Sequence, residues 1–222
     1  MLAAGFAAAA LALLFFGWLA NEVMRGATAG FDAAVRVAAH HYTADWFTWV
    51  MVHISRMGSE WTLVPVGAVI VWLLVRARRR HAAALLAIAS LGGELLNQLL
   101  KLVFARPRPE AAFFGYELPA SYSFPSGHAL VAACFCGSLA AILTRRMRSR
   151  ALRVTVWIGA AVFSALVGFS RIYLGVHYPT DVLAGYAAAV VWVVAVRAGY
   201  DYWLRRRARG PAAAPAGSAP TA

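Results

Sequence analysis

Six apolar runs limit what this chain can fold into. They cover residues 2–20, 61–75, 82–103, 129–143, 154–169 and 182–196. A helix needs ~20 residues to cross the hydrocarbon of a bilayer, so flanking turns and snorkelling arginines complete the shorter runs. The sequence therefore predicts an all-α, polytopic membrane protein built as a bundle of six transmembrane helices.

Composition supports a membrane class over a soluble one. The chain is 62% hydrophobic and only 14% charged, whereas soluble domains contain ~45 to 50% apolar residues. A net charge of +12 would indicate nucleic acid as the partner of a soluble protein, but here the arginines stand in blocks at the ends of apolar runs. We expect no nucleic-acid partner. A cleaved signal peptide is the alternative for residues 2–20, but no basic residue precedes that run, which is long for such a peptide.

The segments outside the runs define the rest of the organisation. Residues 25–60 mix both charge signs with aromatic side chains, which predicts one or two helices lying along the extracytoplasmic membrane surface. Residues 210–222 contain Pro, Ala and Gly without periodicity and predict a disordered cytoplasmic tail. Residues 1–209 are expected to form a single domain.

Three arginine blocks predict the orientation in the membrane. Basic residues concentrate in the cytoplasmic connections of membrane proteins. All three blocks fall on one side of the predicted bundle, so we place that side and both termini in the cytoplasm. Residues 25–60, 104–126 and 170–180 then face outward. The blocks consist of Arg76, Arg78, Arg79 and Arg80; Arg145, Arg146, Arg148, Arg150 and Arg153; and Arg205, Arg206, Arg207 and Arg209.

The last outward connection carries the most concentrated chemistry. Arg171, His177 and Asp181 lie within twelve residues between two apolar runs, where charge is costly unless it has a function. Pro179 disfavours a helix at Tyr178 and suits the first turn of the next helix. We therefore predict His177 on a loop and Asp181 in the first helical turn, where its carboxylate can hold one imidazole nitrogen and leave the other free.

A second connection contains a cluster of cations. Lys101, Arg106 and Arg108 lie around prolines that end the third run, and no carboxylate precedes Glu110. The alternative is a snorkelling lysine with surface arginines. Against it, positive charge is disfavoured on the outward side, and guanidinium groups match phosphate oxygens.

The fourth run opens with Ser126, Gly127 and His128. A helix start presents free backbone N–H groups and the positive end of the helix dipole, which together can bind an anion. A simple capped helix is the alternative. His128 in that first turn could donate a proton to a leaving oxygen.

Taken together, these residues resemble the three signatures of the type 2 phosphatidic acid phosphatase family. The first is Lys101, six residues, Arg108 and Pro109; the second is Pro125 to His128; the third is Ser170 and Arg171, five residues, His177, three residues and Asp181. The resemblance covers roughly residues 32–198. It implies a metal-independent phosphatase of a bacterial inner membrane, with no cofactor and a membrane lipid phosphate as its substrate.

The resemblance also implies roles for individual residues. His177 would be the nucleophile that forms a phosphohistidine, Asp181 would orient it, and His128 would protonate the leaving group. Arg106 lies outside the strict pattern and could share the phosphate. The residues implied to bind phosphate oxygens are Lys101, Arg108, Ser126, Gly127 and Arg171.

Other functions fit parts of this pattern less well. An anion transporter would use the cations but not a histidine and carboxylate pair, and a serine protease using Ser126 would not need four cations. A soluble vanadium haloperoxidase has a similar anion site but does not require six spans. Substrate candidates by family analogy are undecaprenyl diphosphate, phosphatidylglycerophosphate, phosphatidic acid and lipid A phosphates. We favour the polyprenyl diphosphate, because the cation-rich loop could hold two phosphates.

One polar stripe lies outside the signatures. Glu94, Asn97 and Lys101 are spaced by three and four residues and so share one helix face. Glu94 then lies roughly 10 Å deeper than Lys101. A carboxylate at that depth needs a partner, so we expect Glu94 to face the bundle and to hydrogen-bond to a neighbouring helix.

Overall fold

The computed structural model describes residues 2–41 and 43–208, and every regular element within them is an α-helix. The predicted tail, residues 210–222, lies outside the described residues. The helices are α1 (Leu2–Met24), α2 (Ala29–His41), α3 (Asp45–Met57), α4 (Glu60–Arg76), α5 (Arg80–Phe104), α6 (Gly127–Thr144), α7 (Arg150–Tyr173) and α8 (Pro179–Ala208).

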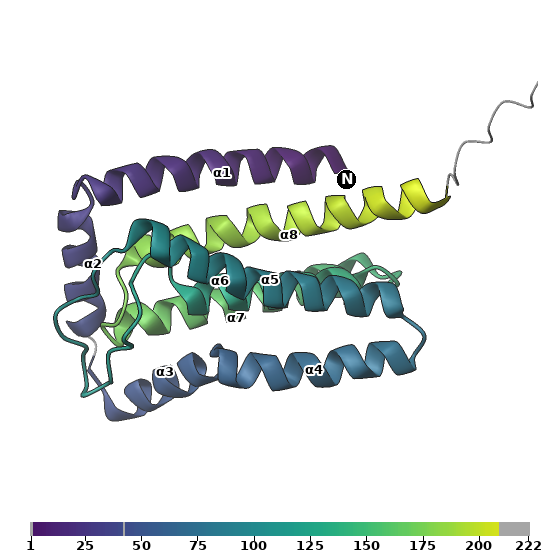
Figure 1. The fold of residues 1–222 in the computed structure, drawn as a ribbon. Coiled ribbons are helices and arrows are strands. Elements are labelled where there is room, and N and C mark those ends of the chain that lie inside the picture. The colour runs from purple at the N-terminus through teal and green to yellow at the C-terminus, as the bar shows by residue number, and fades with distance from the viewer. Residues whose placement is uncertain (1, 42, 209–222) are drawn as a thin grey trace, which may run out of the picture.

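The long helices form a bundle in which α6 is central, packing against α5, α7, α8 and α4 (Figure 1). Its buried positions include the small residues Ala129, Ala132, Cys134 and Ser138. Small side chains let helices approach closely, which is how helices associate where lipid removes the hydrophobic driving force. The bundle therefore packs around the helix that begins with Gly127 and His128.

Large apolar side chains cover the outside of the bundle. Leu14, Trp72, Leu95 and Ile158 are all more than half exposed, as expected for surfaces that face lipid. In the described part of the chain, five helices are long and apolar enough to cross a membrane, or six if α3 and α4 count as one bent span. The predicted all-α membrane bundle is confirmed.

The segment before the second predicted span, residues 25–60, differs in detail from the prediction. Only α2 runs across the end of the bundle (Figure 1). Helix α3, which was expected along the membrane surface, packs against α7 and leads into α4 at a bend of 50°. A Cβ atom on Gly58 would lie 2.3 Å from Val167 Cγ1, so a glycine at the bend is what allows the pair to lie on α7.

The two ends of the bundle have different chemistry. Arg78, Arg79, Arg145 and Arg146, from two of the predicted arginine blocks, line one cavity at one end. The loops after α5 and α7 lie at the opposite end, together with α2 (Figure 1). The arrangement agrees with the predicted division of the chain, while the side of the membrane that each end faces stays a prediction.

Candidate active site

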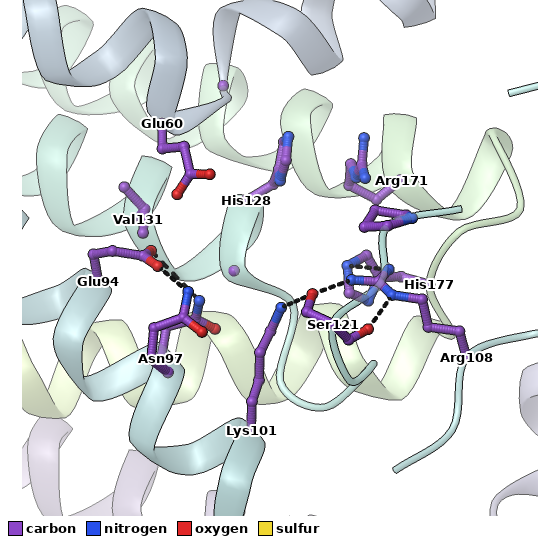
Figure 2. A pocket seen from close by; sticks show the side chains of 14 residues that line it. Glu60, Glu94, Asn97, Lys101, Arg108, Ser121, His128, Val131, Arg171 and His177 are labelled. Atoms are coloured by element: carbon purple, nitrogen blue, oxygen red, sulfur yellow. Dashed lines mark hydrogen bonds between the residues drawn. The ribbon is translucent and has the colours of Figure 1, made fainter. Parts of the chain in front are cut away.

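The three candidate segments meet at the end of the bundle that α2 crosses. They surround a cavity of about 120 Å³. Lys101 comes from α5, Arg108 from the following loop, His128 from α6 and Arg171 from α7 (Figure 2). The lining residues are Gly58, Glu60, Glu94, Asn97, Gln98, Lys101, Arg108, Pro119, Ser121, Gly127, His128, Val131, Arg171 and His177.

Local sequence signals place these side chains. Helix α5 ends at Phe104, and Ala105 takes the left-handed conformation with φ 44°, so the chain turns before Pro107. Helix α6 begins at Gly127 with Ser126 as its N-cap. Helix α8 begins at Pro179, which confirms that His177 lies on a loop and Asp181 in the first helical turn.

His177 and Asp181 form a buried pair. His177 Nδ1 lies 3.2 Å from Asp181 Oδ2, and the two residues are 1% and 0% exposed. Because a carboxylate only accepts, Nδ1 carries the proton and Nε2 presents its lone pair. Burial lowers the pKa of His177 to about 3, despite the opposing effect of Asp181. The imidazole is therefore neutral at physiological pH, with Nε2 facing the cavity.

Three further groups hold the Asp181 carboxylate. Tyr178 N donates to Oδ2 over 2.9 Å, and Ser123 Oγ donates to the same oxygen. Arg106 Nη1 donates to Oδ1 over 2.6 Å. With His177, these donors fix the carboxylate from several directions, and Asp181 lies behind the nucleophile candidate rather than in the cavity wall.

Two of the cations converge on Ser121. Its hydroxyl accepts from Lys101 Nζ at 2.9 Å and from Arg108 Nη2 at 3.1 Å. Arg108 Nη1 also lies 3.3 Å from His177 Nε2. Burial, followed by the nearby charge of Arg171, lowers the pKa of Arg108 to about 10. The cluster therefore carries excess positive charge, which a bound anion would compensate.

Arg171 forms another wall of the cavity. It is 2% exposed, and its Nη1 donates to Ser55 Oγ at 2.6 Å and to Tyr116 Oη at 3.3 Å. Its Nε has no hydrogen-bond partner among the residues that the structure describes. A buried guanidinium paired only with neutral hydroxyls retains its full charge for an anionic ligand.

Two residues differ from the expectation for phosphate binding. Arg106, the extra candidate, does not line the cavity, because its guanidinium pairs with Asp32 and Asp181. Ser126 is fully buried and also lies outside the cavity lining. Gly127 does line it, and a Cβ there would lie 2.7 Å from Asn97 Nδ2, so a larger residue would require the Asn97 side chain to move.

The other end of the cavity is acidic. Figure 2 shows Glu60 and Glu94 on the far side of His128 from Arg171. Glu94 faces the bundle as predicted, but its hydrogen bonds run to Asn97 and Gln98 on its own helix rather than to a neighbouring one. The cavity thus has a cationic wall beside His177 and a carboxylate-lined end beyond His128.

Sequence reasoning missed four polar residues that complete this region: Asp32, Ser121, Ser123 and Thr180. Asp32 stands out in the sequence as an acidic residue in an outward connection. Its partners Arg106 and Thr180 are 74 and 148 positions away, and no periodicity predicts contacts over such separations.

Comparisons with known proteins agree with the geometry. The family model of the PAP2 superfamily matches residues 80–205, more than half of the chain. The chain belongs to the PAP2 superfamily. It is therefore a phosphatase of the membrane lipid phosphatase family, as the three signatures predicted.

Several curated phosphatases are similar to this chain. Phosphatidylglycerophosphatase B of Bacillus subtilis is 34% identical over 87% of this chain and 94% of its own length. Undecaprenyl-diphosphatase BcrC of the same organism is 29% identical over 71% of this chain and 76% of its own length. Lipid A 1-phosphatase of Rhizobium johnstonii is 34% identical over 42% of this chain and 37% of its own length.

Two solved structures share the fold of this chain. The crystal structure of a transmembrane PAP2-type phosphatidylglycerolphosphate phosphatase from Bacillus subtilis matches with a TM-score of 0.80 and 33% identity. The match covers 89% of this chain and 98% of that one. The structure of Aquifex aeolicus LpxE has a TM-score of 0.57 at 22% identity, covers 75% and 94% of the two chains, and shares the fold.

Proposed function

We propose that this PAP2 protein removes phosphate from a membrane lipid through a phosphohistidine on His177. The observation that carries the proposal is a neutral imidazole, held at Nδ1 by Asp181, whose Nε2 lies beside cations in a cavity. A nucleophile needs an available lone pair and a fixed orientation, and His177 has both.

The first step forms the bond between Nε2 and phosphorus and breaks the bond between phosphorus and the lipid oxygen. His128 lines the same cavity, and in this mechanism its imidazolium form, stabilised by the bound phosphate anion, gives a proton to the departing oxygen and becomes neutral. His128 then takes a proton from water, the water oxygen attacks phosphorus, and the bond between nitrogen and phosphorus breaks. The products are the lipid alcohol and inorganic phosphate.

Charge in the transition state is stabilised by fixed groups in the cavity wall. Lys101, Arg108 and Arg171 are cationic, and Gly127 places the N-terminus of α6 at the cavity. Phosphoryl transfer depends mainly on positioning and on charge stabilisation at the phosphoryl oxygens. These cations supply the positive charge that a divalent metal supplies in many such enzymes. We therefore expect activity without a metal or any other cofactor, also in EDTA.

The acidic end of the cavity favours one substrate class over another. The preference for a polyprenyl diphosphate depended on cations for a second phosphate, yet Arg106 is engaged by Asp32 and Asp181. Beyond His128 the cavity presents Glu60 and Glu94, which repel a second phosphate and can accept hydrogen bonds from hydroxyl groups. We therefore propose a lipid phosphomonoester with a hydroxyl-bearing headgroup, such as phosphatidylglycerophosphate, in which a glycerol unit with a free hydroxyl separates the terminal phosphate from the phosphodiester, whereas the two phosphates of a diphosphate are directly linked.

A substrate panel tests both parts of the proposal. Purified protein in detergent with EDTA would be given phosphatidylglycerophosphate, phosphatidic acid, lipid A phosphate and undecaprenyl diphosphate, and released phosphate would be measured. We expect the highest kcat/KM for phosphatidylglycerophosphate. A higher value for undecaprenyl diphosphate overturns the substrate class, and activity that requires added Mg²⁺ overturns the metal-independent mechanism.

Glu94→Gln provides a matched variant for the panel. It removes a negative charge without changing the shape of the side chain, and its effect on phosphatidylglycerophosphate turnover should stay within about threefold. The kcat/KM for undecaprenyl diphosphate should rise relative to that for the monoester, because one carboxylate that repels the second phosphate has been neutralised. If Glu94→Gln abolishes turnover in folded protein, the carboxylate acts in catalysis and its assignment to the headgroup is wrong.

We also propose that the site faces the periplasm and that the arginine-rich end faces the cytoplasm. The proposal rests on the distribution of basic residues between the two ends of the bundle. An epitope tag after Arg209 should be protected in intact cells, and Ala112→Cys should react with an impermeant thiol reagent from outside. The reverse pattern would place the active site in the cytoplasm.

A further inference from the structure

We propose that Asp32 and Arg106 are positioning residues for Asp181, and through it for His177. Neither belongs to the three signatures, and Asp32 also lies outside residues 80–205 that match the family model. The inference rests on the proposed phosphohistidine mechanism and adds to it a buried charge network that sets the rate of the first step.

Arg106 connects the two carboxylates through separate nitrogens. Nη1 donates to Asp181 Oδ1 at 2.6 Å, and Nη2 donates to Asp32 Oδ2 at 2.8 Å. Its guanidinium carbon lies 4.0 Å from the centre of the Tyr178 ring. Burial lowers the pKa of Arg106, but the two carboxylates outweigh it and raise that pKa overall. The guanidinium is therefore held in one orientation by two charges and a ring face.

Asp32 attaches α2 to the first turn of α8. Oδ1 accepts from Thr180 N at 3.1 Å, and Oδ2 accepts from Thr180 Oγ1 at 2.8 Å. The Thr180 hydroxyl in turn accepts from Arg106 Nη1 at 2.9 Å. Asp32 is 1% exposed. It thus satisfies a free N–H at the start of the helix that carries Asp181 in the adjacent position.

The charges explain why two carboxylates share one guanidinium. Phosphorylation at Nε2 makes the His177 ring cationic while Nδ1 keeps its proton. Asp181 must then retain negative charge to stabilise that ring. A guanidinium paired with Asp181 alone would neutralise it. Asp32 takes the second nitrogen of Arg106. The two carboxylates and the one guanidinium therefore have a net charge of −1, and this negative charge lies next to His177.

The remaining charged groups near His177 make this negative charge necessary. Arg108 and Arg171 act on the ring with positive charge from the loop after α5 and from α7. Lys101 on α5 and His128 on α6 line the same cavity. All of them oppose a cationic imidazole. The Asp32 side of the ring is therefore where the developing charge on His177 is offset.

The first test compares Asp32→Asn with Arg36→Gln. Arg36 is a matched control because it also lies on α2 and contacts the loop before His177, donating to Gly175 O at 3.3 Å. Within the described part of the chain no hydrogen bond or ion pair joins Arg36 to Asp181, and its guanidinium carbon lies 5.4 Å from the centre of the Tyr178 ring. Both proteins would be purified as monodisperse full-length chains and assayed well below their melting temperatures. The substrate is the lipid phosphate that the wild type hydrolyses fastest. The measurements are kcat, KM and the rapid-quench rate of phosphoenzyme formation.

We expect Asp32→Asn to lower kcat and the rate of phosphoenzyme formation roughly 10- to 100-fold, with KM within about twofold, because the loss falls on the transition state. Arg36→Gln should keep kcat within about threefold of wild type. The kcat of Arg106→Lys should lie between that of the wild type and that of Arg106→Gln. An ammonium keeps the positive charge but cannot bind two carboxylates at once as the guanidinium does. Wild-type kcat in Asp32→Asn, or an equal loss in Arg36→Gln, overturns the proposal.

A second measurement does not depend on activity. Arg106→Met leaves two buried carboxylates without a cation, so its melting temperature in detergent should fall sharply. Adding Asp32→Asn to that variant should restore part of the loss, because one uncompensated charge is removed. Additive losses would show that the two residues do not act as a pair. Failure of the proposed function would appear in the wild-type assay, whereas failure of this inference would appear only in the variants.

Discussion

The two sides of the His177 ring are built in opposite ways. On the Nδ1 side, Asp181, Arg106 and Asp32 are paired with one another and with Thr180 and Ser123. On the Nε2 side, Arg108 and Arg171 face a cavity, and a buried nitrogen of Arg171 has no partner within the described chain. A saturated cluster holds a geometry, whereas an unsaturated cluster of like charge favours an anionic ligand.

Arg106 and Arg108 show the same difference between paired and uncompensated charge within a single loop. They are separated by one proline, yet one guanidinium lies between two carboxylates and the other lies among cations. The raised pKa of Arg106 and the lowered pKa of Arg108 follow from these surroundings. Residue type therefore does not reveal function here, because the partners determine whether an arginine is held between carboxylates or lines a cavity with its charge uncompensated.

The largest effect should come from His177→Ala, which removes the group shared by both sides. We expect loss of at least about 10⁴-fold in kcat and complete loss of an acid-labile phosphoenzyme, because among the residues that line the cavity it is the His177 ring whose Nδ1 is held by a carboxylate, which leaves Nε2 to attack. Rapid quench with ³²P-labelled lipid measures both. A phosphoenzyme that still accumulates in His177→Ala would break the comparison, since the ring would then not be the acceptor.

His128→Ala should have a smaller effect that depends on the leaving group. Loss of a general acid typically costs about 10²- to 10⁴-fold, and poor leaving groups suffer most because they need the proton. The measurement is the rate of phosphoenzyme formation for a lipid phosphate and for an aryl phosphate. Equal losses on both substrates would argue that His128 does not protonate the leaving oxygen.

Inhibition by vanadate should distinguish the role of Arg108 from that of Arg106. It imitates the five-coordinate phosphoryl group, so it should inhibit the wild type, and Arg108→Gln should weaken that inhibition roughly 10- to 100-fold. Arg106→Lys should keep the vanadate inhibition constant within about threefold, because Arg106 does not line the cavity. Equal weakening in both variants would remove the distinction between a positioning side and a binding side.

A prediction of a different kind concerns the pH dependence of stability, which reports on the burial of the ring and not on catalysis. His177 has a folded-state pKa of about 3, lowered by burial, against 6.5 when unperturbed. Between these values the unfolded chain binds a proton that the folded chain does not, so stability falls as the pH drops from about 6.5 toward 3. His177→Gln lacks this term, and its melting temperature in detergent should decline less steeply between pH 7 and pH 4. Parallel slopes would show that the ring titrates normally in the folded protein.

Much of the site could be predicted because its signals are local. Pro179 starts α8, Gly127 starts α6, and prolines follow the end of α5, so the positions of His177, His128 and Arg108 relative to their helices follow from backbone chemistry. The apolar runs likewise predict the helices. The course of α3 could not be predicted in this way, because its packing on α7 depends on Val167 lying against Gly58.

The sequence by itself determined the class of the protein, the helices and the candidate residues of the site, since hydrophobic length, proline and glycine act over a few residues. Only the tertiary structure decided what each charge does. The pairing of Arg106 with Asp32 and Asp181, the convergence of Lys101 and Arg108 on Ser121, and the acidic end formed by Glu94 join distant segments. Electrostatic energy depends on distance and burial in space, and neither quantity is determined by position along the chain.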